Sequence, residues 1–248
     1  NRQFDAMWLS SLCDSTFKGQ PDIEIVDFSS RAKTIDEILN VSTKPLIVDT
    51  DTGGPPEHFT HYVRTLERMG VSAAIIEDKT GLKRNSLFGT EVTQTLEVPQ
   101  RFAEKINAGK HAQSTRDFMV IARLESLIAG AGIEDALERA RLYVTAGADG
   151  IMIHSRQKDG REVFEFMSAF RREYPKLPLV VVPTSYNSFT EEELAAGGAT
   201  IVIYANHLLR SAYPAMKRTA ESILRHRRSL EVDQDIMPIR DVIRIIPE

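Results

Sequence analysis

The sequence predicts an α/β protein of the (β/α)8 TIM-barrel type, for three reasons. Short apolar runs alternate with amphipathic segments along almost the whole chain, and apolar strands covered by helices are typical of a parallel sheet buried on both faces. The length of 248 residues is about that of one such barrel domain. Polar side chains follow almost every apolar run, at the strand ends where barrels of this type carry their active sites.

Seven apolar runs predict the strands of this barrel. In chain order they are Phe4–Leu9, Leu46–Asp49, Ala73–Glu77, Phe118–Arg123, Gly150–His154, Leu179–Val182 and Thr200–Tyr204. The amphipathic segments that predict helices include Pro56–Met69, Val98–Asn107, Glu134–Ala146, Glu162–Arg172 and Glu191–Ala196. Gly70, Gly147 and Gly197 follow three of them, as glycine often does at helix C-termini.

The two ends of the chain depart from a complete barrel. A closed barrel of this type has eight strands, so we expect the chain to begin one β/α unit into the domain. At the other end, His207–Arg228 predicts a long helix and Asp233–Ile245 a further helical extension. We expect a single domain over residues 1–248, in which residues 207–248 pack on a partner subunit or exchange with it.

The composition is that of an ordinary globular protein and argues against several kinds of partner. A net charge of -4 gives no case for binding nucleic acid or an anionic membrane surface. No uninterrupted apolar run approaches the roughly 20 residues of a membrane span, and the N-terminus shows no secretory apolar region. The single cysteine, Cys13, excludes an intrachain disulfide and fits a reducing compartment. We therefore expect a cytoplasmic protein.

The segment Pro45–Gly54, PLIVDTDTGG, places two carboxylates at the end of a predicted strand. Residues two apart on a strand point to the same side, so Asp49 and Asp51 face one side if strand geometry persists. Two like charges held together repel unless a cation or a proton lies between them, and carboxylate oxygens suit Mg²⁺. A solvated turn is the open alternative, because Asp, Thr and Gly all favour turns.

Three further strand ends carry ionisable side chains. Glu77 would add a carboxylate to the metal site, or it would form a salt bridge with Lys79 at a solvated strand end. Arg123 needs an anion, which a substrate carboxylate or phosphate would supply, although Glu125 would serve equally well. His154 would act as a hydrogen-bond donor, a base or a ligand, or would simply be satisfied by a neighbour.

A glycine-bounded loop, Thr80–Gly89 (TGLKRNSLFG), follows the third strand. Such loops often act as lids that exclude water from a site. Lys83 would neutralise an anionic substrate, and Asn85 and Ser86 would donate hydrogen bonds to its oxygens. An exposed basic surface loop is the alternative interpretation.

The end of the first strand offers hydrogen-bond donors. Trp8, Ser10, Ser11 and Leu12 follow one another there, and hydroxyls with backbone N–H groups form nests for phosphoryl oxygens. Asp27 ends a loop that would fold back over them.

Taken together, these segments resemble the phosphoenolpyruvate mutase family of the isocitrate lyase/PEP mutase superfamily. EDKTGLKRNS (Glu77–Ser86) is similar to the lid of that family. The other similar segments, in the family's order, are WLSSL (Trp8–Leu12), DTDTGG (Asp49–Gly54), ARLE (Ala122–Glu125), MIHS (Met152–Ser155), VPTSY (Val182–Tyr186) and YANHLLR (Tyr204–Arg210). The resemblance spans nearly the whole chain.

The resemblance implies that the protein interconverts phosphoenolpyruvate and phosphonopyruvate, which makes the carbon–phosphorus bond of phosphonate biosynthesis. It implies Mg²⁺ held directly by Asp49 and through water by Asp51 and Glu77. The catalytic residues it implies are Asp27, Lys83, Asn85, Arg123 and His154. The substrate contacts it implies are Trp8, Ser10, Leu12, Asn85, Ser86, Arg123 and His154. It also implies a homo-oligomer, a dimer or a tetramer.

Three other functions remain open. A phosphonopyruvate hydrolase would share the metal site, but its lid differs around the position of Asn85. A carbon–carbon lyase of the same superfamily would carry a cysteine in its lid, whereas Thr80–Ser86 contains none. A barrel that only binds a ligand would have lost one or more of Asp49, Arg123 and Asn85. Some family members also have Trp-Gly-Ser-Gly-Leu in place of WLSSL, which leaves the role of Ser11 open.

Overall fold

The computed structural model describes residues 3–81, 83–86 and 94–246, so residues 82 and 87–89 of the predicted loop Thr80–Gly89 lie outside the described residues. The described residues form one sheet of seven parallel strands in sequence order. These strands are β1 (Met7–Leu9), β2 (Leu46–Asp49), β3 (Ala73–Glu77), β4 (Met119–Leu124), β5 (Gly150–Ile153), β6 (Leu179–Val181) and β7 (Ile201–Val202). All seven predicted strands are confirmed, and the first and the last are each three residues shorter than expected.

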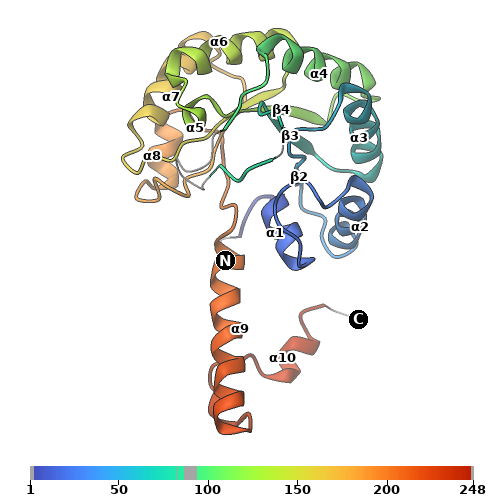
Figure 1. The fold of residues 1–248 in the computed structure, drawn as a ribbon, viewed down its shortest axis with the longest axis vertical. Coiled ribbons are helices and arrows are strands. Elements are labelled where there is room, and N and C mark those ends of the chain that lie inside the picture. The colour runs from blue at the N-terminus through green and yellow to red at the C-terminus, as the bar shows by residue number, and fades with distance from the viewer. Residues whose placement is uncertain (1–2, 82, 87–93, 247–248) are drawn as a thin grey trace. The chain divides into compact units, whose positions relative to one another are not determined.

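Helices connect these strands. They are α1 (Ser11–Phe17), α2 (Phe28–Leu39), α3 (Pro56–Met69), α4 (Pro99–Ala112), α5 (Ser126–Ala129), α6 (Gly132–Thr145), α7 (Arg161–Glu173) and α8 (Glu191–Ala196). Helices α3, α4, α6, α7 and α8 lie along the outer side of the curved sheet (Figure 1). The predicted barrel-type α/β fold is therefore confirmed. Helices α1, α2 and α5 were not among the predicted segments, and α4 extends five residues beyond the predicted end at Asn107.

The two faces of the sheet carry separate apolar clusters. Side chains alternate faces along a strand, so Ile47 and Ile75 belong to the inner cluster, whereas Val48 and Ile76 belong to the larger cluster that packs under the helices. The inner face therefore leads directly to the strand ends, where the polar residues follow.

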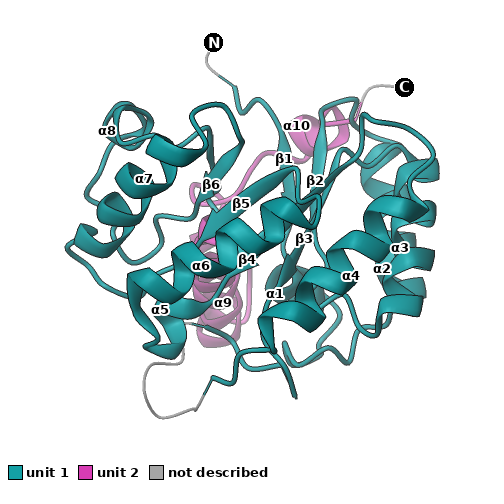
Figure 2. Ribbon diagram, turned by 90° about the horizontal axis from the view of Figure 1, so that it is seen from above, with its two compact units in different colours: residues 1–205 teal, residues 206–248 magenta. Residues whose placement is uncertain are grey.

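The chain divides into two compact units, residues 1–205 and 206–248 (Figure 2). In the second unit, α9 (His207–His226) and α10 (Ile239–Ile243) confirm the predicted helical extension. No residue of α9 is buried, and Leu208 and Leu224 on it are each 77% exposed. Packing of this unit on a partner subunit stays a prediction. Among the described helices, none is both long enough and apolar enough to cross a membrane.

Candidate active site

Alternation along the strands directs four ionisable side chains toward the inner face. Asp49 lies two residues after Ile47, Glu77 two after Ile75 and Arg123 two after Ile121, and these isoleucines all belong to the inner cluster. His154 likewise follows Met152 of that cluster. The strands are parallel, so their C-terminal ends meet at one edge of the sheet. The four side chains are thus collected at the open end of the barrel interior, as predicted.

The turn after β2 brings Asp51 to Asp49 by a different geometry from the one expected. Strand β2 ends at Asp49, and Asp51 adopts the left-handed conformation with φ of 54°, so the assumption of continued strand geometry is wrong. The carboxylate of Asp49 accepts a hydrogen bond from the backbone N–H of Asp51 at 3.2 Å. Both residues are buried, which excludes the solvated turn.

The two carboxylates have opposite pKa shifts. Burial alone would raise the pKa of Asp49, but the positive charges of Lys83, Arg123 and Arg31 lower it overall. Burial and the charge of Asp49 raise the pKa of Asp51. The pair thus behaves as two like charges that need a cation nearby.

Lys83 supplies one such cation. Its ammonium group lies 2.7 Å from Asp22 Oδ1, contacts a carboxylate oxygen of Asp51 and donates to Ser11 Oγ at 2.5 Å. Ser11 in turn donates its hydroxyl hydrogen to Asp49 Oδ2 at 2.9 Å. Lys83 is buried, so for this residue the interpretation as an exposed basic loop is wrong.

Asp22, which the sequence analysis did not single out, is the acidic residue that joins the site. Besides the ammonium of Lys83, it accepts a hydrogen bond from Asn85 Nδ2 at 3.1 Å. The expected residue, Asp27, is exposed and caps α2 instead, because its carboxylate accepts a hydrogen bond from Ser30 N at 2.8 Å. The placement of Asp27 over the site was therefore wrong. The sequence Asp-Phe-Ser-Ser could have signalled this, because aspartate is a favoured N-cap residue.

A second group of side chains lies around Glu125, on the loop after β4. Arg123 Nε lies 2.5 Å from Glu125 Oε1, and Ser86 donates its hydroxyl hydrogen to Glu125 Oε2 at 2.6 Å. Ser86 also accepts from Arg123 Nη2 and from Lys79 Nζ, both at 2.9 Å. His154 Nδ1 lies 3.1 Å from Glu125 Oε1. The internal partner foreseen for Arg123 is therefore present.

The side chains of this second group differ in their ionisation. Burial would raise the pKa of Glu125, but the charge of Arg123 and the hydrogen bond from His154 hold it well below its usual range. Burial and the charge of Arg123 lower the pKa of His154, which favours a neutral imidazole. Arg123 therefore remains a fixed cation of this group, beside Lys79, and His154 acts as a neutral hydrogen-bonding side chain.

Glu77 lies between these groups. Its Oε2 is 3.4 Å from Arg123 Nη1, and its Oε1 is 3.3 Å from Lys79 Nζ, so the salt bridge with Lys79 is present. Even so, Oε1 has no hydrogen-bond partner among the described residues. Burial raises the pKa of Glu77 to about 7, because a carboxylate with an unsatisfied oxygen is costly away from water.

These carboxylates match Mg²⁺ by their chemistry. Mg²⁺ prefers hard oxygen ligands and commonly binds one or two carboxylates, as Asp49, Asp51 and the unsatisfied oxygen of Glu77 would offer. In the part of the chain that the structure describes, however, no three acidic, histidine or cysteine side chains are arranged to hold an ion. The assignment of these residues to a metal remains a prediction.

The residues after β1 take different roles from one another. Ser10 caps α1, since its hydroxyl accepts a hydrogen bond from Cys13 N at 3.4 Å. Ser11, whose role was open, is the hydroxyl that contacts Asp49 and Lys83. Trp8 packs against the inner cluster, and its indole N–H lacks a partner among the described residues. Leu12 is half-buried in the first turn of α1.

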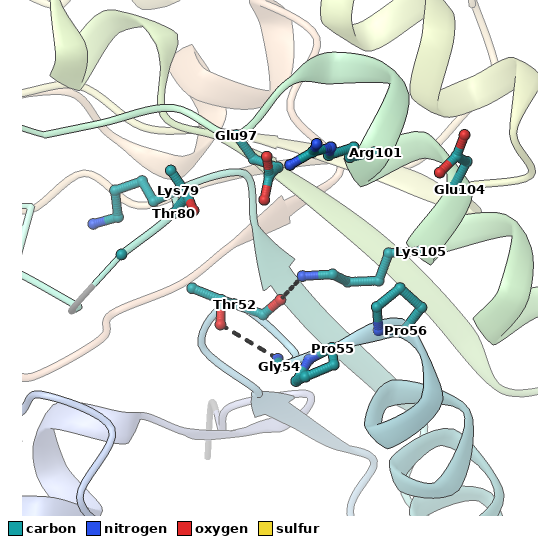
Figure 3. A pocket seen from close by; sticks show the side chains of 11 residues that line it. Thr52, Gly54, Pro55, Pro56, Lys79, Thr80, Glu97, Arg101, Glu104 and Lys105 are labelled. Atoms are coloured by element: carbon teal, nitrogen blue, oxygen red, sulfur yellow. Dashed lines mark hydrogen bonds between the residues drawn. The ribbon is translucent and has the colours of Figure 1, made fainter.

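A cavity of about 400 Å³ lies next to Lys79, between the turn after β2, the loop after β3 and the start of α4 (Figure 3). Arg101 and Lys105 line it from α4, and Lys105 Nζ donates to the carbonyl of Thr52 at 2.7 Å across it. Lys79 is the one residue it shares with the groups described above.

Comparison with known proteins shows one family over almost the whole chain. The family model described as phosphoenolpyruvate phosphomutase matches residues 1–224. The chain is 39% identical over 244 residues to a phosphonopyruvate hydrolase from Variovorax sp. (strain Pal2), covering 98% of this chain and 83% of that protein. The crystal structure of a phosphoenolpyruvate phosphomutase from Streptomyces platensis subsp. rosaceus has a TM-score of 0.91 and 37% identity, with 97% of this chain and 82% of that chain covered. A phosphonopyruvate hydrolase in complex with oxalate and Mg²⁺ has a TM-score of 0.86, with the same identity and coverage.

Proposed function

The chain belongs to the phosphoenolpyruvate phosphomutase family, and on this premise we propose that it interconverts phosphoenolpyruvate and phosphonopyruvate by intramolecular phosphoryl transfer. The family includes both a mutase and a hydrolase among the relatives of this chain. The choice between them depends on whether water reaches the phosphoryl group.

The contact between Asn85 and Asp22 supports the mutase. A hydrolase needs a base or an open position that activates water. Here both oxygens of the Asp22 carboxylate are engaged, one by Lys83 at 2.7 Å and the other by Asn85 at 3.1 Å. An amide such as that of Asn85 donates hydrogen bonds but does not take up a proton at neutral pH. The segment from Lys83 to Ser86 thus supplies binding groups while occupying the nearby base.

Charge at the site suits a loose transition state. Moving a phosphoryl group from oxygen to carbon within one molecule passes through a metaphosphate-like species, which positive charge and hydrogen bonds stabilise. We assign this role to Arg123, Lys83 and neutral His154, with Asn85 as a further donor. Exclusion of water prevents loss of the group as free phosphate, and no covalent nucleophile is required.

The remaining assignments complete the proposal. Asp49, Asp51 and Glu77 would hold Mg²⁺, which would neutralise the substrate's carboxylate and enol oxygen when bound. The substrate's other proposed contacts are Trp8, Ser10, the backbone of Leu12 and Ser86. The proposal includes a cytoplasmic homo-oligomer, a dimer or a tetramer joined through residues 207–248, that acts in phosphonate biosynthesis. No nucleic acid or membrane partner is invoked.

Phosphorus NMR of phosphonopyruvate mixed with the protein tests the proposal. Conversion to phosphoenolpyruvate with Mg²⁺, and none with a chelator, is the expected result. Release of free phosphate would favour the second candidate function, the hydrolase. The 39% identity to a phosphonopyruvate hydrolase supports that candidate. No change in the spectrum would exclude both reactions.

A further inference from the structure

Arg31, on helix α2, binds the turn that carries the carboxylates of Asp49 and Asp51. Its Nη1 donates to the main-chain carbonyl of Asp49 at 2.5 Å and lies 2.9 Å from Asp51 Oδ2. The arginine is only 4% exposed. One nitrogen therefore joins the end of β2 to the carboxylate two residues later.

The turn needs such a restraint. Asp51 has a φ of 54°, a conformation that residues other than glycine rarely adopt and that persists where surrounding contacts hold it. The carbonyl of Asp51 accepts a hydrogen bond from Glu77 N at 2.8 Å. Any relaxation of the turn would thus shift Asp51 relative to both Asp49 and Glu77.

Arg31 differs from Lys83, which binds the same carboxylate. Lys83 contacts Asp51 through Oδ1 and arrives from the loop after β3, whereas Arg31 contacts Oδ2 and arrives from a regular helix. The Nε side of the guanidinium makes weaker contacts. Arg31 Nε lies 3.8 Å from Asp14 Oδ2 and has no hydrogen-bond partner among the described residues. The contacts of Arg31 are therefore concentrated on the turn.

We propose that Arg31 is a positioning residue that sets the affinity of Asp49 and Asp51 for a divalent cation, without touching the cation or the substrate. This inference rests on the metal-binding part of the proposed function. Residues that orient metal ligands typically change metal affinity by about 10- to 100-fold when they are replaced.

Binding of Mn²⁺ to the full chain, followed by the electron paramagnetic resonance signal of the free ion, tests this role without substrate. Arg31→Met is expected to weaken Mn²⁺ binding by about 10-fold or more. Arg31→Lys keeps the charge but cannot reproduce the planar guanidinium contact, so it is expected to weaken binding too. Wild-type affinity in both variants, or tighter binding from loss of a competing cation, would overturn the inference. If Arg31→Met does not fold, Arg31→Lys decides alone.

Two controls separate this inference from the proposed function. Arg171→Met removes another arginine that binds main-chain carbonyls, those of Gly198, Tyr174 and Leu177. It lies on α7, between β5 and β6 in the chain, whereas α2 lies between β1 and β2, and its loss is expected to leave Mn²⁺ affinity unchanged. Equal loss in that variant would make the effect of Arg31 a general loss of stability. Asp49→Asn is expected to abolish tight binding; if it binds Mn²⁺ as the wild type does, the proposed metal site itself fails.

Discussion

Glu77 and Arg123 face each other across neighbouring strands, because they are register partners on β3 and β4 and Arg123 Nη1 lies 3.4 Å from Glu77 Oε2. The same guanidinium reaches Glu125 through Nε at 2.5 Å. Arg123 thus connects the carboxylate assigned to the metal with the group around Glu125. A substrate phosphoryl group bound at Arg123 would lie next to that carboxylate.

Replacement of Arg123 by lysine is expected to lower kcat/KM by about 100-fold or more, the cost of removing a well-placed donor of transition-state stabilisation. Lysine keeps the charge near Glu125 but lacks the planar fork. Arg123→Ala would also remove the closest cation from the buried Glu125 and one of two cations from Glu77, and is expected to lose about 3–5 kcal/mol of stability. Steady-state kinetics with thermal unfolding separates the two effects, and wild-type kcat/KM in Arg123→Lys would remove Arg123 from the chemistry.

Asp49→Ala is expected to abolish Mg²⁺-dependent turnover while the protein stays folded. Removal of this carboxylate relieves its repulsion of the buried Asp51, and Lys83 and Arg31 keep Asp51 as an ion-pair partner, so we expect the protein to remain folded. The measurement is turnover of phosphonopyruvate against Mg²⁺ concentration, with circular dichroism as the check on folding. Chelation of the wild-type protein should have the same effect and be reversed by added Mg²⁺. Collapse of the fold in Asp49→Ala would instead make the residue structural.

The sequence predicted those site residues whose position is fixed by the alternation of side chains along a strand. Asp49, Glu77, Arg123 and His154 were found because each follows an apolar strand in which alternation of side chains fixes the face. Asp22 was missed because it lies in a loop between α1 and α2, where no periodicity relates a residue to the sheet. Its partners, Lys83 and Asn85, are more than 60 residues away in the chain.

The turn after β2 shows a different limit. Alternation predicted that Asp51 would lie near Asp49, and it does, but through a left-handed residue rather than a continued strand. Aspartate tolerates that conformation better than most residues, so the sequence Asp-Thr-Asp-Thr-Gly allows either geometry. The role of Ser11, which the sequence left open, depends on local structure in the same way, because α1 begins at Ser11 and Ser10 is its N-cap.

Asn85→Ala is expected to slow the interconversion by about 100-fold, because it removes a donor at the phosphoryl group and frees one oxygen of Asp22. The neighbouring Arg84, whose side chain is exposed, provides a matched control: Arg84→Ala is expected to stay within about twofold of wild-type turnover, because surface changes are usually small. Product analysis by phosphorus NMR should also show a larger share of free phosphate from Asn85→Ala. Unchanged rate and products would exclude Asn85 from the reaction.

Asp78, buried beside the site, is expected to make stability depend on pH. Its carboxylate accepts hydrogen bonds from Glu125 N at 2.8 Å, Tyr143 OH at 2.9 Å and Arg139 Nη1 at 3.1 Å. Burial nevertheless outweighs these bonds and raises the pKa of Asp78 from 3.8 to about 6. The folded state therefore binds this proton more readily than the unfolded chain does, and stability from this group falls as the pH rises between about 4 and 6.

The expected size follows from the same values, since 1.36 kcal/mol for each pH unit between 3.8 and about 6 gives roughly 3 kcal/mol. Asp78→Asn lacks the titrating group. The free energy of unfolding of the wild type, relative to that of the variant, should therefore increase as the pH is lowered from 7 to 4. Urea unfolding of both proteins at several pH values measures the difference, and titration of Glu77 cancels because both proteins contain it. Tyr143→Phe keeps the carboxylate but removes a donor to its charged form, so its pH dependence should move to higher pH. A difference between wild type and Asp78→Asn that stays constant from pH 7 to 4 would show that Asp78 is ionised throughout and that its three donors, rather than burial, determine its state.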